Sequence, residues 1–299
     1  NTCVLLTDGD IKCFGKGSHG VLGYGDTTSR GLAAASMGDN LPAVDLGTGK
    51  SALQLSCGRR QCCAVLDDNS LKCWGQNSNG QLGIESNTTH GKGDGPMGDG
   101  LPAVDLGTGS TAQHVSVGYD HVCALLDNGW VKCWGGNANN KGQLGYGDKV
   151  DRGGQPNQMG DNLPAVDLGA GRTAVRVVAG NYFTCAILDD QSLKCWGEGL
   201  GGKLGQGSED SIGDTSNQMG DFLPAIDFGT APLTATTTSR TTTATTTTTT
   251  SRTTSTSRTT STSRTTSQTT ATLTATSRTT TATTTTTTSR TTSQTTATQ

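Results

Sequence analysis

Eight of the ten cysteines form four pairs with one spacing, and thiols so placed could serve structural or redox chemistry. Nine residues separate the members of each pair, which are Cys3/Cys13, Cys63/Cys73, Cys123/Cys133 and Cys185/Cys195. Turn residues such as Asp127-Asn128-Gly129 lie between them, so each pair spans a predicted hairpin. In a hairpin centred on Asn128, Cys123 and Cys133 lie opposite each other, at a separation that a disulfide spans. We therefore predict a disulfide in every hairpin.

Disulfides imply an oxidising compartment, so we expect the chain outside the cell or at the cell surface. The alternative is a cytoplasmic or nuclear protein whose reduced thiols serve as small core residues. Zinc is disfavoured, because the C-x9-C spacing differs from that of zinc sites and no histidine recurs in phase. Cys57 and Cys62 lie outside the periodic pattern. They could bridge each other, or one could be a free thiol beside Arg59 and Arg60.

Other motifs that suggest chemistry lack the context they need. Gly15–Gly20 and Gly197–Gly202 both match G-x-G-x-x-G, but neither opens a helix in a βαβ unit. Gly47–Ser51 resembles the end of a phosphate-binding loop, yet Val44 stands where that loop requires glycine. We therefore expect no cofactor and assign no cofactor-binding residues.

Histidines and carboxylates do not form a catalytic set. The four histidines are scattered, at positions 19, 90, 114 and 121, and no Ser/His/Asp arrangement recurs, so we predict a protein that is not an enzyme. Two aspartates recur in phase, at positions 39, 99, 161 and 221 and at positions 45, 105, 167 and 227. We expect these carboxylates to hydrogen-bond turns and strand ends, with calcium binding as the alternative. No metal ligands are assigned.

A repeat of about 60 residues must position all of these groups. The first cysteines of the four pairs are 60, 60 and 62 residues apart, and a Met-Gly-Asp-x-Leu-Pro-Ala block begins in the same phase at Met37, Met97, Met159 and Met219. Each period contains four short apolar segments separated by Gly, Asp or Asn, which in the third copy are Pro164–Leu168, Ala174–Val178, Cys185–Leu188 and Leu193–Trp196. Four short antiparallel strands per repeat predict an all-β protein built from propeller blades.

The repeat resembles that of the regulator of chromosome condensation. The matching residues in the second copy are Ala64, Leu66, Trp74, Gly75, Asn77, Gly80, Gln81, Leu82 and Gly83. In the third copy they are Ala124, Gly129, Trp134, Gly135, Gly142, Gln143, Leu144 and Gly145. The resemblance implies a β-propeller, seven-bladed in the family, whose members include exchange factors, ubiquitin-ligase modules and a secreted β-lactamase inhibitor of the superfamily's protein II type.

The repeat count departs from that family. Residues 1–229 supply units near 1–40, 41–100, 101–162 and 163–222, and a last strand at 223–229. Closure of a ring would pair that last strand, Pro224–Phe228, with the opening hairpin, but a further strand would then be absent. We therefore expect a partial ring, with a complete four-bladed propeller as the alternative. An open arc would leave strand edges through which two copies could associate.

Residues 230–299 form a separate segment of low complexity, rich in Thr, Ser and Arg, which we expect to be disordered. It could be an O-glycosylated stalk, an unmodified linker or a gene-model artefact. Asn87-Thr88-Thr89 is an acceptor sequence for N-glycosylation in a predicted loop, so Asn87 is a candidate glycosylation site.

Charge also divides at this boundary. The chain has 22 basic and 25 acidic residues, and six arginines but no acids lie in the tail, which leaves 16 against 25, or −9, for the propeller. An acidic domain argues against nucleic acid as a partner. No run of 18 apolar residues is present, so no transmembrane segment is expected.

Function is therefore predicted from the loops of a rigid scaffold. Three long polar insertions, Tyr24–Ser36, Ile84–Pro96 and Tyr146–Gln158, vary between copies. Variable loops on a rigid ring are where binding residues gather, although they could also be surface decoration. We predict a non-catalytic binding or scaffold propeller for a protein or glycan, with a Thr-rich stalk. The alternative is an intracellular regulatory propeller of the exchange-factor or ubiquitin-ligase-associated type.

Overall fold

The computed structural model describes residues 1–93, 95–137 and 141–229, so the predicted tail lies outside the described residues. Contacts group Asn1–Asp227 into one compact unit. This unit is all-β, as predicted. Its strands are β1 (Thr2–Leu5), β2 (Ile11–Phe14), β3 (Ala52–Cys57), β4 (Gln61–Leu66), β5 (Leu71–Gly75), β6 (Ala112–Val117), β7 (His121–Leu126), β8 (Val131–Gly135), β9 (Ala174–Ala179), β10 (Phe183–Leu188) and β11 (Leu193–Gly197).

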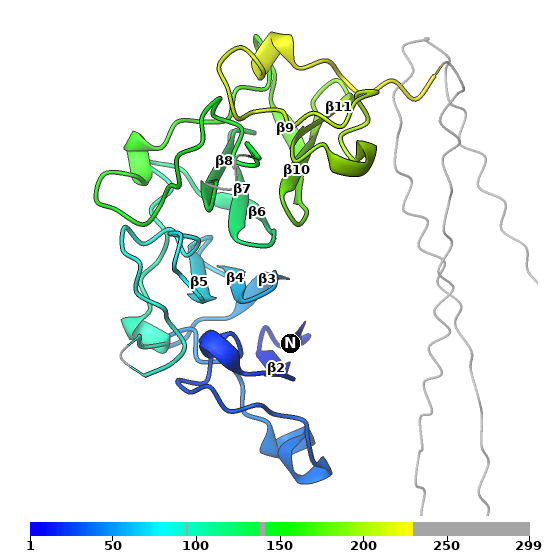
Figure 1. Cartoon of the computed structure of the whole chain (residues 1–299). Coiled ribbons are helices and arrows are strands. Elements are labelled where there is room, and N and C mark those ends of the chain that lie inside the picture. The colour runs from blue at the N-terminus through cyan, green and yellow to red at the C-terminus, as the bar shows by residue number, and fades with distance from the viewer. Residues whose placement is uncertain (94, 138–140, 230–299) are drawn as a thin grey trace, which may run out of the picture. The chain divides into compact units, whose positions relative to one another are not determined.

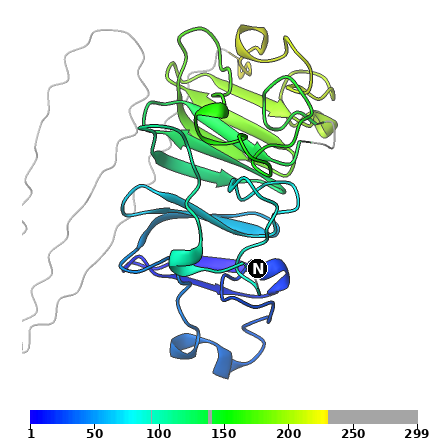
Figure 2. The ribbon, with the colours of Figure 1, turned by 90° about the vertical axis from the view of Figure 1, so that its left-hand side faces the viewer.

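The strands form an opening hairpin, β1–β2, and three antiparallel sheets of three strands each. We call these sheets the first blade (β3–β5), the second blade (β6–β8) and the third blade (β9–β11). They lie side by side in chain order (Figures 1 and 2), and β3, β6 and β9, the first strands of the blades, contact one another in turn. The arrangement confirms propeller-type blades.

Turn chemistry fixes the register of each hairpin. At the tip of the second blade, Trp130 N donates to the Asn128 side chain (2.9 Å) and Gly129 has φ 80°, a conformation that glycine adopts without strain. Cys123 and Cys133 consequently lie opposite each other. The other predicted pairs are opposed in the same way, which confirms the predicted register in all four hairpins.

The predicted fourth strand is present only as an extended segment. Pro164–Leu168 contains no residue in strand conformation and makes one backbone hydrogen bond to a hairpin, from Val166 N to Val131 O of β8 (2.7 Å). Proline has no N–H group to donate, and the Asp167 carboxylate accepts from Gly169 N (2.9 Å), so the segment turns away. The segment thus covers the outer strand of the blade that precedes it.

The last segment of the described chain pairs in the same way. Ile226 N of Pro224–Phe228 donates to Leu193 O of β11 (2.8 Å). The segment therefore completes the third blade. In chain order, each blade consists of a three-stranded sheet followed by its own Leu-Pro-Ala segment.

A buried lysine holds each of these segments in place. Lys132 in β8 is 6% exposed, and its Nζ donates to Leu106 O (2.9 Å) and Gly160 O (2.8 Å). Burial lowers the pKa of this ammonium group. Lys72 and Lys194 make the equivalent bonds in the neighbouring blades. One cation thus satisfies carbonyl groups on two irregular segments that have few backbone partners of their own.

Short 3₁₀ helices occupy the connections, and no helix in the described ranges is long and apolar enough to cross a membrane. They are η1 (Ser18–Gly20), η2 (Ala34–Ser36), η3 (Gly38–Asn40), η4 (Gly98–Gly100), η5 (Gly160–Asn162), η6 (Leu200–Gly202) and η7 (Gly220–Phe222).

The apolar core lies between successive blades. A tryptophan near the end of each third strand is fully buried there, and its indole nitrogen donates to a carbonyl group of the preceding repeat. Trp134 donates to Gln81 O at 3.2 Å, and Trp74 and Trp196 make the equivalent bonds to Val21 O and Gln143 O. The recurring tryptophan therefore joins neighbouring repeats as well as filling the core.

Candidate functional site

The turns between the first and second strands of the three blades meet on one face of the arc. They bound a cavity of about 370 Å³, lined by Cys57, Gly58, Arg59, Val117, Gly118, Tyr119, Ala179, Gly180 and Asn181. Tyr119 N, in the turn of the second blade, donates to Asn181 O in the turn of the third blade (3.2 Å). A Cβ atom at Gly58 would lie 2.0 Å from Gly118 O, so glycine is required for this approach. The recurring glycine thus lets three turns form one surface.

Aromatic and cationic side chains stack along these turns. The Arg59 guanidinium lies over the Tyr119 ring, 4.6 Å from its centroid, and the centroids of Tyr119 and Tyr182 are 4.8 Å apart. We call Arg59, Tyr119 and Tyr182 the turn surface. Arg59 is exposed and, within the described residues, forms no ion pair. A free guanidinium beside two aromatic rings can bind a carboxylate and an apolar group together.

Asp120, which follows Tyr119, is a buried carboxylate with an unsatisfied oxygen. It is 8% exposed; Oδ2 accepts from Asn79 Nδ2 (3.3 Å), whereas Oδ1 has no hydrogen-bond partner. Burial, reinforced by the charge of Asp151, raises the pKa of Asp120 to about 6. The carboxylate is therefore charged at neutral pH and destabilises the folded state.

Replacement of Asp120 by asparagine should stabilise the protein at neutral pH. Because the pKa of Asp120 in the folded state lies above that in the unfolded state, the penalty is present above about pH 6 and vanishes below about pH 4. We expect Asp120→Asn to raise the free energy of unfolding by on the order of 2 kcal/mol at pH 7.5 and by little at pH 4. Urea titrations at both pH values measure this, with exposed Asp127→Asn as the control. An equal gain at both pH values would contradict the assignment.

His121 is structural. It is fully buried, and its Nε2 lies 3.0 Å from Thr184 Oγ1, whose hydroxyl donates to Gln143 O (2.9 Å). Since that hydroxyl proton is used, Nε2 must be the donor toward Thr184. Burial lowers the pKa of His121 to about 3, so the ring is neutral. It acts as a hydrogen-bonded core group.

Several of the in-phase aspartates accept hydrogen bonds from the protein's own turns. Asp99 accepts from both Thr48 N (2.8 Å) and Thr48 Oγ1 (2.6 Å), and these bonds lower the pKa of its carboxyl group. Asp161 makes the same pair of bonds to Thr108, and Asp45 accepts from Gly47 N. These contacts match the expected turn and strand-end role. None of these aspartates belongs to a group of potential metal ligands within the described ranges.

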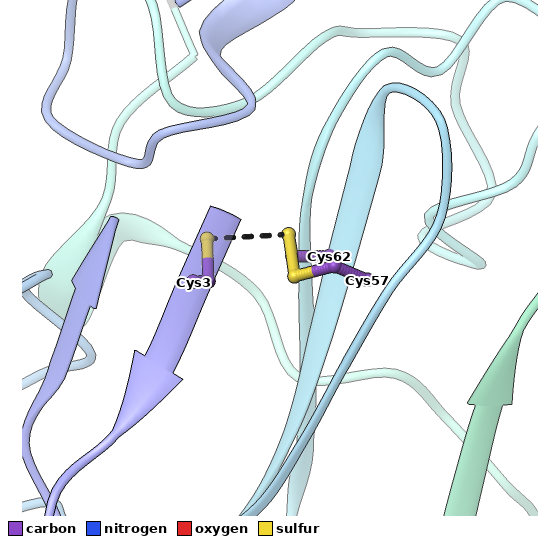
Figure 3. A group of neighbouring side chains, drawn as sticks. All are labelled: Cys3, Cys57 and Cys62. Atoms are coloured by element: carbon purple, nitrogen blue, oxygen red, sulfur yellow. Dashed lines mark hydrogen bonds between the residues drawn. A yellow bond between two sulfur atoms is a disulfide. The ribbon is translucent and has the colours of Figure 1, made fainter. Parts of the chain in front are cut away.

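The structure joins the four predicted cysteine pairs and also Cys57 with Cys62, whose Cα atoms lie 4.1 Å apart across the turn of the first blade. The sulfur of Cys3 comes within 3.8 Å of the sulfur of Cys62 (Figure 3). Both sulfurs are in disulfides and carry no hydrogen, so this is a van der Waals contact. Cys3, Cys57 and Cys62 are near enough together to bind a metal. Thiolates are the metal-binding form of cysteine, so the disulfide-bonded cluster does not fit a metal.

Two of the three variable loops are held by internal ion pairs. Arg30 pairs with Asp26 (3.0 Å) and lies over Tyr24, and in a later repeat Arg152 pairs with Asp148 and lies over Tyr146. The arginines that these loops could offer to a ligand are therefore engaged. Asn87 is exposed, and its glycosylation stays a prediction.

Periodicity could not reveal the turn surface. Arg59, Tyr119 and Asn181 occupy one repeat position, whereas Tyr182 occupies the next, in phase with Arg60 and Asp120. Because the residue types at these equivalent positions differ between repeats, the turn surface is not part of the recurring pattern. The sequence did contain one signal: the chain has only four tyrosines, and two of them, Tyr119 and Tyr182, lie in these turns.

The blades and their turns define a β-propeller repeat protein. Its repeats are those of the regulator of chromosome condensation (RCC1), whose sequence model matches residues 53–81, 112–143 and 174–202. This confirms the resemblance seen in the sequence.

Two longer proteins are similar in sequence to this chain. The chain is 31% identical over 206 residues to the ultraviolet-B receptor UVR8 of Arabidopsis thaliana, covering 68% of this chain and 41% of the receptor. It is 27% identical over 215 residues to the human E3 ubiquitin-protein ligase HERC2, covering 70% of this chain and 4% of the ligase. The chain therefore spans less than half the length of either protein.

Solved structures of yeast RCC1, Prp20, have the same fold. The structure of Prp20 bound to Kap60 gives a TM-score of 0.53 at 17% identity and covers 75% of this chain and 46% of that chain. Prp20p from Saccharomyces cerevisiae, whose structure is described with its binding properties to Gsp1p and histones, gives 0.52 at 18% identity and covers 75% and 48%.

Proposed function

We propose that this chain is a non-catalytic binding propeller outside the cell that takes a protein partner on the turn surface. The observation that carries the proposal is the stacked row of Arg59, Tyr119 and Tyr182 beside a cavity to which three blades contribute. Tyrosine and arginine are the residue types on which protein interfaces depend most strongly. The five disulfides support an oxidising compartment, and the Thr-rich segment would serve as the stalk.

The chemistry of the turn surface favours an acidic segment of the partner. Arg59 has no ion pair of its own within the described residues, so a carboxylate can approach it without displacing another anion. The rings of Tyr119 and Tyr182 offer an apolar area next to that charge. We therefore propose a partner segment in which Asp or Glu stands next to an aromatic or large apolar residue. A protein is favoured over a glycan because Prp20 is described as bound to Kap60.

An array of immobilised random ten-residue peptides tests this proposal with the full chain. We expect bound peptides to be enriched in acidic residues next to aromatic ones, and Arg59→Ala and Tyr119→Ala to weaken their binding by about tenfold or more each. Arg172→Ala is the control. Arg172 is also exposed, but it pairs with Asp190 (2.8 Å) and precedes β9, at the end of that strand away from the turn surface. The proposal would be overturned if a variant lacking both Arg59 and Tyr119 side chains still bound the peptides. It would also be overturned if the chain bound an array of glycans and not the peptides.

An intracellular regulatory propeller is the second candidate. The names of UVR8 and HERC2, a receptor and a ubiquitin-protein ligase, favour a regulatory role. Alkylation of the natural protein without reductant, followed by peptide mass mapping, separates the two candidates. Linked peptides for Cys63–Cys73, Cys123–Cys133 and Cys185–Cys195 are expected outside the cell, whereas fully alkylated cysteines would place the intracellular regulator first.

A further inference from the structure

We propose that Cys57 is a modification site for a small anionic thiol of the glutathione class, and that its modification moves a disulfide from Cys3–Cys13 to Cys3–Cys62. The Cys57–Cys62 pair has no counterpart in the other blades. The residues in phase with it are Val117 opposite Val122 in the second blade, and Ala179 opposite Thr184 in the third. Since those blades form the same turn without a disulfide, the fold does not require this one.

The two sulfurs of this disulfide differ in access. Cys57 is half-buried and lines the cavity of the turn surface together with Arg59, whereas Cys62 is fully buried. An incoming thiolate can therefore reach the Cys57 sulfur and not that of Cys62. The exposed guanidinium of Arg59 attracts a thiol that carries carboxylates. Attack forms a bond between the incoming sulfur and Cys57 Sγ, breaks the Cys57–Cys62 bond and leaves Cys62 as a buried thiolate.

The released Cys62 thiolate lies beside a second disulfide. Its sulfur is 3.8 Å from Cys3 Sγ (Figure 3). Asn1 Nδ2 lies 4.0 Å from the same sulfur and can donate to it. Attack on Cys3 forms a Cys3–Cys62 bond, breaks the Cys3–Cys13 bond and leaves the electron pair on the Cys13 sulfur, which takes up one proton. One disulfide is exchanged for another and the incoming thiol ends as a mixed disulfide, so no oxidant is needed.

Exchange of this kind is confined to one interface. Between the second and third blades, Cys123 faces the hydroxyl of Thr184 instead, with Sγ and Oγ1 3.7 Å apart. A threonine hydroxyl cannot accept a disulfide, so the later hairpins serve as internal controls. The product differs in topology, because Cys3 lies in β1 and Cys62 in β4. A bond within the opening hairpin thus becomes a bond between that hairpin and the first blade. This exchange does not depend on the proposed partner.

The test treats the oxidised full chain with reduced glutathione, quenches with acid, alkylates free thiols and maps the peptides. We expect glutathione on Cys57, a new Cys3–Cys62 linked peptide and alkylated Cys13, appearing at least about tenfold faster than any change at Cys123–Cys133 or Cys185–Cys195. Glutathione found on Cys3 instead, or on Cys57 while Cys3–Cys13 stays linked and Cys62 is alkylated, would overturn the proposal. So would reaction of all disulfides at one rate.

Two variants make the result independent of the incoming thiol. Cys57→Val alone leaves Cys62 as a free thiol, and the Cys3–Cys62 peptide should then form without glutathione. Cys57→Val combined with Cys62→Val installs the pair that the second blade already carries, and Cys3–Cys13 should then react about as slowly as the later hairpins. An intact Cys3–Cys13 bond beside an alkylated Cys62 in the single variant would refute the exchange.

Discussion

Replacement of Trp134 by alanine is expected to lower the free energy of unfolding by about 3–5 kcal/mol. The side chain is fully buried in the core between the first and second blades, and its indole N–H donates to Gln81 O. The surroundings cannot collapse into the space, because the blades on either side are rigid sheets. A Cβ atom at Gly83 would lie 2.6 Å from the indole nitrogen, so the preceding repeat is shaped around this ring. The variant thus opens a cavity and leaves a carbonyl group unpaired.

Trp130 provides the matched control, since it is a tryptophan of the same hairpin with 52% of its surface exposed. Trp130→Ala should change the free energy of unfolding by about 0.5 kcal/mol or less. Trp134→Phe retains most of the apolar contacts but lacks the donor, so we expect a loss between those of the two alanine variants. Urea titrations followed by far-ultraviolet circular dichroism measure all three without relying on tryptophan fluorescence. If both alanine variants lowered the free energy of unfolding equally, the packing of Trp134 against the preceding repeat would contribute no stability.

The sequence predicted those features that depend on local spacing. The opposition of Cys123 and Cys133 follows from the residues between them, so turn chemistry was sufficient to set the register. The fourth strand was harder, because Pro164 has no N–H and Asp167 turns its carboxylate back to Gly169. Apolar composition alone predicted a strand where the hydrogen bonds allow only an extended segment.

Features that depend on how blades approach each other were beyond the sequence. The contact between Cys3 and Cys62 joins residues 59 positions apart, and it exists only because the opening hairpin packs against the first blade. Lys132 is a similar case, since alternation along a strand does not reveal that its ammonium group reaches two buried carbonyl groups. The repeats therefore predict the structure of a single blade well. The contacts between blades become predictable only once the relative positions of the blades are known.

Reduction of the hairpin disulfides is expected to have the largest effect on stability. Cysteines ten positions apart close loops for which chain entropy predicts about 2–3 kcal/mol each. Four such contributions approach the whole stability of an ordinary domain, about 5–15 kcal/mol. We expect the oxidised chain to unfold at a much higher urea concentration than the chain held in excess reductant. Because excess reductant also breaks Cys57–Cys62, the double variant Cys185→Ala with Cys195→Ala should lose about one fifth of that difference.

The comparison distinguishes a covalent from a packing role for these cysteines. Apart from Cys3 and Cys185 they are buried, so as reduced thiols they would still fill the core. If packing alone mattered, the reduced chain would keep its unfolding midpoint, whereas the alanine double variant would lose stability through the cavities it creates. If the covalent bonds matter, reduction of all the disulfides should lower the stability more than replacement of any single cysteine pair does. An unchanged midpoint on reduction would therefore remove the support that the disulfides give to a place outside the cell.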